Sequence, residues 1–226
     1  MSGDHIVRSY DEELNQLTST VQQVMSLAEE QIGRALKAVS ESDESLAKEV
    51  IDNDQEIDLL EREAHRMGAR LIALREPKGG DLRKIIASMR TVVDVERVGD
   101  YAVNVVKLLP LVREKLPEGV VDELERMGVI VTSMLRELRQ AFGTGDMEKA
   151  VEIWKQDDEV DELYVELMTH ARSRMERLQN GERLELYKDV VFMAKALERM
   201  GDHLTNVAEH IYEMVLGLPM EHPTRP

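Results

Sequence analysis

The chain of 226 residues contains 45 Asp and Glu against 29 Lys and Arg, which gives a formal net charge of −16, and it contains no cysteine. This charge excludes nucleic acid and anionic membrane surfaces as natural partners, because like charges repel over a Debye length of about 8 Å. The missing thiols exclude disulfides and thiolate metal sites, so any metal ion must bind oxygen or imidazole. No uncharged apolar run approaches the roughly 20 residues of a membrane span, and we expect a soluble chain without direct membrane insertion.

Apolar residues recur at helical spacing through almost the whole chain, whereas the alternation typical of strands is nearly absent. Ser or Asp in "SESDES" can cap a helix, and "REPKGG" ends one, because Pro77 lacks an amide hydrogen and glycine tolerates positive φ. Pro110 and Pro117 mark a further interruption. In chain order we predict six helices, followed by a frayed tail from residue 218: 10–39, 46–74, 81–106, 121–142, 148–179 and from the "NGER" turn to 216.

Two stretches of the chain recur in its second half. "DVERVGDYAVN" at 94–104 shares five of eleven residues with "ALERMGDHLTN", which lies 102 positions further on. "ESDESLAKEVIDNDQEID" at 41–58 precedes "TGDMEKAVEIWKQDDEVD" by 103 positions. The nearly equal offsets indicate a tandem duplication of a three-helix unit. Because helices joined by short turns pack antiparallel, we predict an all-α fold of two antiparallel three-helix bundles, residues 1–112 and 113–226.

Each repeat carries acidic residues at a spacing of one helical turn. Glu96 lies in phase with Val92 and Val103 on the apolar stripe of its helix, where an unpaired buried charge costs several kcal/mol. If neighbouring helices are antiparallel, the carboxylates of each half meet at one seam and need cations to stay ionised. Hard oxygen ligands suit iron, Mn²⁺, Mg²⁺, Ca²⁺ or Zn²⁺, and the spacing does not choose among these ions. The candidate metal ligands are Glu96, Asp100, Asp54 and Asp58 in the first half and Glu198, Asp202, Asp157 and Asp161 in the second.

These residues also allow simpler interpretations. Two acids four residues apart on a helix are usually both solvated. Arg97 and Arg199 either orient neighbouring acids as bidentate donors or form salt bridges between helices. Asn104 and Asn206 either add neutral oxygen ligands or serve as polar packing, and the glycines of the repeat either bring helices close or give an ion access.

Motifs of catalysis are missing from the sequence. None of the six histidines completes the Glu-x-x-His pattern of di-iron carboxylate proteins. The chain also lacks a phosphate-cradling glycine loop, a G-x-S-x-G elbow and an H-E-x-x-H helix. We therefore predict that the protein is not an enzyme, with a metal-dependent phosphohydrolase as the remaining catalytic alternative.

The duplicated plan, with "DLRKIIASMRTVVDVERVGDYAVNVVK" in the first half and "ALERMGDHLTNVAEHIYEMVLG" in the second, resembles the PhoU family of phosphate-transport accessory and regulatory proteins. The resemblance extends over residues 10–218. It departs from the family at Glu76-Pro77, where Gln-Pro is usual. This segment is a turn with either residue.

The resemblance implies a cytoplasmic, non-catalytic negative regulator of phosphate uptake and phosphate-starvation signalling. Such a protein links the ATPase subunit of a phosphate ABC transporter, PstB-like, to a PhoR-like sensor histidine kinase, and commonly forms a homodimer. It also implies metal clusters on the acidic motif, which maps to Glu96, Asp100, Glu198 and Asp202, and less directly to the aspartates of the second and fifth helices. A metal-free docking scaffold, whose acids meet basic residues of a partner, is the alternative.

Overall fold

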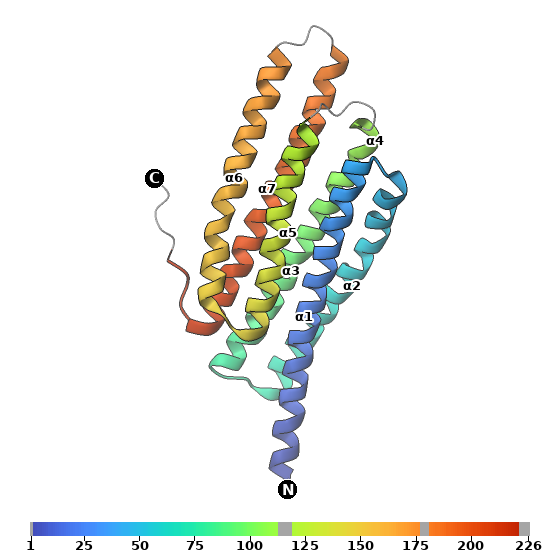
Figure 1. The fold of residues 1–226 in the computed structure, drawn as a ribbon. Coiled ribbons are helices and arrows are strands. Elements are labelled where there is room, and N and C mark those ends of the chain that lie inside the picture. Colours follow the sequence, from blue (N-terminus) through green and yellow to red (C-terminus); the bar gives the residue numbers. More distant parts are fainter. Residues whose placement is uncertain (1, 113–118, 177–180, 222–226) are drawn as a thin grey trace.

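The computed structural model describes residues 2–112, 119–176 and 181–221, and within these ranges every regular element is a helix (Figure 1). The helices are α1 (Ser2–Glu41), α2 (Glu44–Arg75), α3 (Gly80–Lys107), α4 (Leu109–Val112), α5 (Val120–Thr144), α6 (Met147–Glu176) and α7 (Gly181–Leu216). The six predicted helices are confirmed as α1–α3 and α5–α7. The predicted end of the fifth helix, residues 177–179, lies outside the described residues, and the single turn α4 was not predicted.

Side-chain and backbone caps set the helix ends. Asp43 caps α2, because its carboxylate accepts hydrogen bonds from the amides of Ser45 (2.9 Å) and Leu46 (3.1 Å). The predicted capping role of "SESDES" is therefore confirmed. Gly145 ends α5 with a left-handed φ of 70° and donates its amide hydrogen to the carbonyl oxygen of Ala141. The chain then turns sharply and lays α6 back along α5.

Two antiparallel three-helix bundles pack along their length. α1, α2 and α3 pack on one another, as do α5, α6 and α7, and α3 also packs along α7 and α1 along α5. Figure 1 shows the long helices aligned with one common axis. The apolar stripes meet in the interior, where Leu17, Ile57, Leu135 and Leu138 are at most 1% exposed. The predicted all-α fold of two tandem bundles is confirmed, whereas the predicted boundary after residue 112 borders residues 113–118, outside the described residues.

The tail that follows α7 is packed. Gly217, with φ 73°, turns the chain and donates its amide hydrogen to the carbonyl oxygen of Glu213 at 2.8 Å. Met220 is only 9% exposed and joins the apolar core. The prediction of a frayed tail is therefore wrong up to Glu221, because one apolar side chain holds this segment against the bundle. The rest of the predicted tail, residues 222–226, lies outside the described residues.

In the part of the chain that the structure describes, no helix is long and apolar enough to cross a membrane. The apolar residues of each helix occupy one stripe, and charged residues interrupt every long apolar window.

A polar network joins the two bundles across α3 and α7. The Asp94 carboxylate on α3 accepts hydrogen bonds from three side chains of α7: His203 Nδ1 at 2.9 Å, Asn206 Nδ2 at 3.1 Å and His210 Nε2 at 2.8 Å. Burial opposes ionisation of Asp94, but these hydrogen bonds outweigh it and hold the pKa of the carboxyl well below its usual range. Asn206, a candidate ligand or packing residue in the sequence, is therefore part of the contact between bundles.

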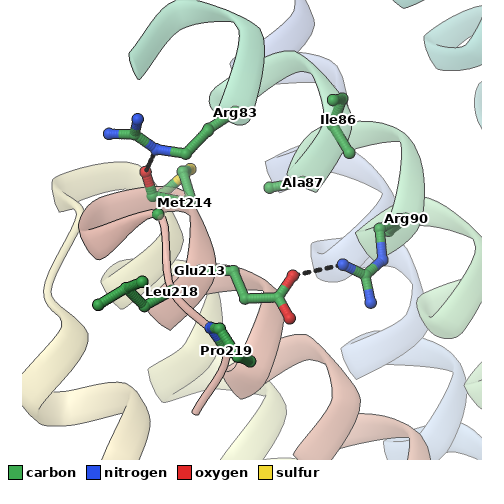
Figure 2. A pocket seen from close by; sticks show the side chains of 9 residues that line it. Arg83, Ile86, Ala87, Arg90, Glu213, Met214, Leu218 and Pro219 are labelled. Atoms are coloured by element: carbon green, nitrogen blue, oxygen red, sulfur yellow. Dashed lines mark hydrogen bonds and ion pairs between the residues drawn. The ribbon is translucent and has the colours of Figure 1, made fainter. Parts of the chain in front are cut away.

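A second polar contact between the bundles lies near the end of α7 (Figure 2). Arg83 Nε donates to the carbonyl oxygen of Met214 at 3.1 Å, and Arg90 forms an ion pair with Glu213. The guanidinium of Arg83 thus satisfies one of the free carbonyl groups at the carboxyl end of α7. Both arginines border a cavity of about 310 Å³.

The substitution Asp94→Asn tests the α3–α7 network. We expect it to lower the free energy of unfolding at pH 7 by about 2–3 kcal/mol, because it removes a half-buried charge that three donors share. The folded-state pKa of Asp94 lies below the unfolded value of about 3.9, so the carboxylate stabilises the fold above that value. The difference between parent and variant should therefore shrink as the pH falls below about 4.

Urea unfolding followed by circular dichroism over a pH series measures both effects. Asp52→Asn, at an exposed position of α2, is the matched control. Equal stability of the two variants at pH 7 would show that the network contributes nothing.

Candidate functional site

The structure places the eight predicted ligands in two sets, one in each repeat. We call Asp54 and Asp58 on α2 with Glu96 and Asp100 on α3 the first acidic row. The second acidic row consists of Asp157 and Asp161 on α6 with Glu198 and Asp202 on α7. Asp157 is 2% exposed, and the other seven residues are half-buried. Each row therefore follows the seam between the second and third long helices of its repeat.

Close helix packing in the first row depends on Gly99. A Cβ atom at this position would lie 3.1 Å from Ile57 Cδ1 and 3.4 Å from Asp54 Oδ1, so the missing side chain lets the Asp54 carboxylate lie against α3. Gln31 on α1 fixes this arrangement, because its Nε2 donates to Asp54 Oδ1 at 2.9 Å and to the carbonyl oxygen of Gly99 at 3.2 Å. One buried amide thus links the three helices of the first bundle.

The carboxylates of the first acidic row act on one another. Burial raises the pKa of Glu96, and the negative charges of Asp100, Asp58 and Glu61 raise it further, against the opposing charge of Arg97. Burial likewise raises the pKa of Asp54; the Gln31 hydrogen bond opposes this shift, and the charges of Asp100 and Asp58 add to it. A bound cation would relieve this repulsion.

The same helix contact is tighter in the second row. A Cβ atom at Gly201 would lie only 2.3 Å from Asp157 Oδ1, so the buried carboxylate of Asp157 occupies the space that a side chain would need. Both glycines are therefore points of close helix packing, one of the two roles that the sequence left open.

Basic residues contact both acidic rows from outside. Arg97 pairs with Glu96 (3.4 Å) and Asp100 (2.9 Å), and Arg199 pairs with Asp202 at 3.2 Å, in each case within one helix. The expected salt bridges between helices are therefore wrong for these arginines, because their side chains extend along their own helices to Asp100 and Asp202, three residues further on. The second row has an additional cation, because Lys195 Nζ donates to Glu198.

The rows differ in how well their residues fit a metal ion. Among the described residues, no three carboxylate or imidazole side chains are gathered closely enough to hold a metal ion. The first row still has suitable chemistry, because it consists of oxygen donors, and burial together with their mutual repulsion raises the pKa of Asp54 and Glu96. In the second row an ammonium group already contacts Glu198.

Several residues at these seams were missed in the sequence. Gln31 is a polar residue at a buried position on the apolar stripe of α1. A polar residue within that apolar pattern is the signal by which the sequence could have identified it. Asp94 and the histidines of α7 gave no signal, because their contact joins segments more than 100 positions apart. Lys195 differs from its counterpart Val93 in the repeat, a difference that is visible once the repeats are aligned.

Alanine substitution at the two glycines tests the helix contacts. We expect Gly201→Ala to lower the free energy of unfolding by about 1–3 kcal/mol, because the new Cβ overlaps the Asp157 carboxylate. Gly99→Ala should cost less, since Ile57 can shift and alanine gains up to about 1 kcal/mol of helix propensity. Gly33→Ala is the matched control, with no atom within 4 Å of the new Cβ, and should stabilise α1. Chemical unfolding of the three variants decides the order, and a Gly201→Ala protein as stable as Gly33→Ala would rule out the contact.

Both repeats of the chain match known proteins. The PhoU domain family model matches residues 21–109 and again residues 124–211. The phosphate-specific transport system accessory protein PhoU homolog of Caulobacter vibrioides (strain NA1000 / CB15N) is 35% identical over 215 residues, covering 95% of this chain and 93% of that protein. The homolog of Zymomonas mobilis is 36% identical over 221 residues, covering 98% and 92%.

Two crystal structures agree with this match. The phosphate transport system regulatory protein PhoU from Streptococcus pneumoniae aligns with a TM-score of 0.87 and 27% identity over 94% of this chain and 100% of that chain. PhoU from Pseudomonas aeruginosa aligns with a TM-score of 0.87 and 28% identity over 92% and 100%. Because the family model matches both repeats and the sequence relatives cover nearly the whole chain, this protein belongs to the PhoU family.

Proposed function

We propose that this protein is a cytoplasmic, non-catalytic regulator that restrains phosphate uptake and phosphate-starvation signalling when phosphate is plentiful. The observation that carries the proposal is the similarity, through both repeats, to proteins named as accessory or regulatory proteins of phosphate transport. Its partners are the PstB-like ATPase subunit of a phosphate ABC transporter and a PhoR-like sensor histidine kinase. The protein acts on both as a homodimer.

The charge of the molecule supports a docking role. The chain has a net charge of −16, and each repeat has an acidic row along a helix seam. Such surfaces favour basic segments of partner proteins and speed the encounter with them. The two repeats thus offer two related surfaces, one for each partner.

A metal ion on the first acidic row is part of the proposal. Asp54, Asp58, Glu96 and Asp100 would hold it only after their side chains turn toward one another, since no three of them are gathered closely enough in the described structure. The ion would be iron, Mn²⁺, Mg²⁺, Ca²⁺ or Zn²⁺. When bound, the ion supplies positive charge that neutralises the repulsion among the carboxylates. The raised pKa values of Asp54 and Glu96 support this assignment. The second acidic row has the same spacing, but Lys195 already contacts its Glu198.

A metal-free docking scaffold is the second candidate function. It is favoured by the contacts of Arg97, which pairs with both acids of α3. In this candidate a basic side chain of a partner protein replaces Arg97 at Glu96 and Asp100.

Deletion of the gene tests the regulatory role. In high-phosphate medium we expect the deletion strain to express its phosphate-starvation genes and to take up excess phosphate, because the restraint on transporter and kinase is lost. A reporter of phosphate-regulon expression and uptake of ³²P-phosphate measure the two effects. Re-expression of the full chain should restore the parent values, and an unchanged deletion strain would contradict the proposal.

The double substitution Glu96→Gln with Asp100→Asn separates the two candidates. If a metal ion binds the first acidic row, the variant purified without tag or chelator should lose it, because amides are weaker ligands for hard cations than carboxylates. Elemental mass spectrometry measures the metal, and co-purification measures binding of the ATPase subunit. Glu148→Gln with Glu152→Gln, an exposed acid pair of α6 with the same spacing, is the matched control. Unchanged metal content with lost partner binding would instead support the scaffold.

A further inference from the structure

One outer stripe of α3 alternates basic and apolar side chains. At steps of three and four residues along the helix it contains Arg83, Ile86, Arg90, Val93 and Arg97. Ile86 is 43% exposed and Val93 is 38% exposed, and α3 exposes no other large apolar side chain. Steps of three and four keep residues on one side of a helix, which is the spacing found where a helix packs along another helix.

The stripe adjoins the cavity of about 310 Å³ between α3 and the segment that follows α7 (Figure 2). Ile86 and Ala87 line the cavity from α3, and Met214, Leu218 and Pro219 line it from the other side. Leu218 is 64% exposed. The cavity lies at the small end of the range of about 300–1,000 Å³ for small-molecule sites, which favours an inserted side chain of a partner over a whole cofactor.

Arg83 brings to this cavity a positive charge that no carboxylate of the described residues neutralises. Its Nε donates to the carbonyl oxygen of Met214 at 3.1 Å, and its Nη2 donates to that of Val215 at 3.5 Å. The side chain lies against Gly217, where an added Cβ atom would lie 3.3 Å from its Cδ, Nε and Cζ atoms. These contacts hold the guanidinium in place, but carbonyl groups do not cancel a full charge.

The other two arginines of the stripe can exchange their present partners. Arg90 pairs with Glu213, and its side chain is 49% exposed. Arg97 pairs with Glu96 and Asp100, and its side chain is 53% exposed. An exposed ion pair contributes little to stability, so an incoming carboxylate can replace the present one. On a chain with a net charge of −16, a stripe with three arginines and no acid favours an acidic partner over a basic one.

We propose that this stripe of α3 and the adjoining cavity bind an acidic amphipathic helix of a partner protein. An aliphatic side chain of that helix enters the cavity beside Ile86, and carboxylates on the same face of the helix pair with Arg83 and Arg90. Val93 and Arg97 extend the contact along α3. Because the arginines recur every seven residues, the carboxylates of the partner recur at about the same interval.

This surface is opposite in charge to the acidic rows. Its occupant therefore differs from the basic segments that the proposed function assigns to those rows. The inference does not depend on whether the partner belongs to phosphate transport.

Site-specific photocross-linking in cells tests the inference. The photoreactive amino acid p-benzoylphenylalanine replaces Ile86 in the full chain and, as the matched control, Val129, an apolar residue of α5 that is 65% exposed. Mass spectrometry identifies the cross-linked peptides. The position 86 protein is also made with Arg90→Glu, or with Lys48→Glu at an exposed position of α2, which changes the net charge equally. Circular dichroism of the purified proteins verifies the helical fold of each variant.

We expect position 86, and not position 129, to cross-link to a segment of another protein in which Asp or Glu recurs about every seven residues among aliphatic residues. Arg90→Glu should lower the yield by about tenfold or more, and Lys48→Glu should leave it unchanged. A synthetic peptide of the cross-linked segment should bind the purified parent protein. The same peptide with Asn and Gln in place of its acids should bind about tenfold more weakly or worse.

The absence of a cross-link at position 86 above the level at position 129 overturns the inference. A cross-link to a second copy of this chain or to a basic segment does the same, and so does an equal loss of yield in both charge variants. These outcomes are separate from the deletion test. A deletion strain with a normal phosphate response would refute the proposed function, yet an acidic segment cross-linked at position 86 would still support the docking surface on α3.

Discussion

In each repeat an aspartate carboxylate packs directly against the backbone of the next helix. Asp54 does so at Gly99 and Asp157 at Gly201, where an added Cβ atom would lie 3.4 Å and 2.3 Å from the respective carboxylate oxygen. This contact sets how closely the second and third long helices of a bundle approach. In the first row, Asp58 and Asp100 lie one helical turn beyond Asp54 and Glu96, and at this helix spacing their negative charges act on both of those carboxyl groups.

Duplication has kept this backbone arrangement and changed what surrounds it. Gln31 connects Asp54 to α1 in the first bundle, and Lys195, whose ammonium group also lies over the Tyr164 ring, pairs with Glu198 in the second. A helix seam lined by acids has to be stabilised by donors or cations, since burial penalises each charge. The protein uses a neutral amide in one half and an ammonium group in the other. The two acidic rows are thus chemically different.

The fold was predictable because helical periodicity is a local pattern that recurs along nearly the whole chain. The two repeats also carry the same pattern, so each half supports the interpretation of the other. Asp43 in "SESDES" marked the start of α2, and the repeat of Glu-Arg-x-Gly-Asp indicated which helices are equivalent. The same repeat identified the eight candidate acids, but it did not predict which side chains surround them. The contact of Lys195 with Tyr164 depends on how two helices are rotated against each other, which apolar spacing fixes only coarsely. Met220 was missed for a related reason, since the burial of a single side chain beyond a helix end leaves no periodic pattern.

The contact between the bundles is one-sided, with the carboxylate of Asp94 supplied by α3 and the imidazoles supplied by α7. At the positions equivalent to His203 and His210 the first repeat has Tyr101 and Leu108, and at the position equivalent to Asp94 the second repeat has Ala196. A chain with two first repeats would lack both imidazoles, and a chain with two second repeats would lack the acid. The two repeats have therefore become complementary, because each supplies one side of this contact. Neither repeat can take the place of the other in the chain.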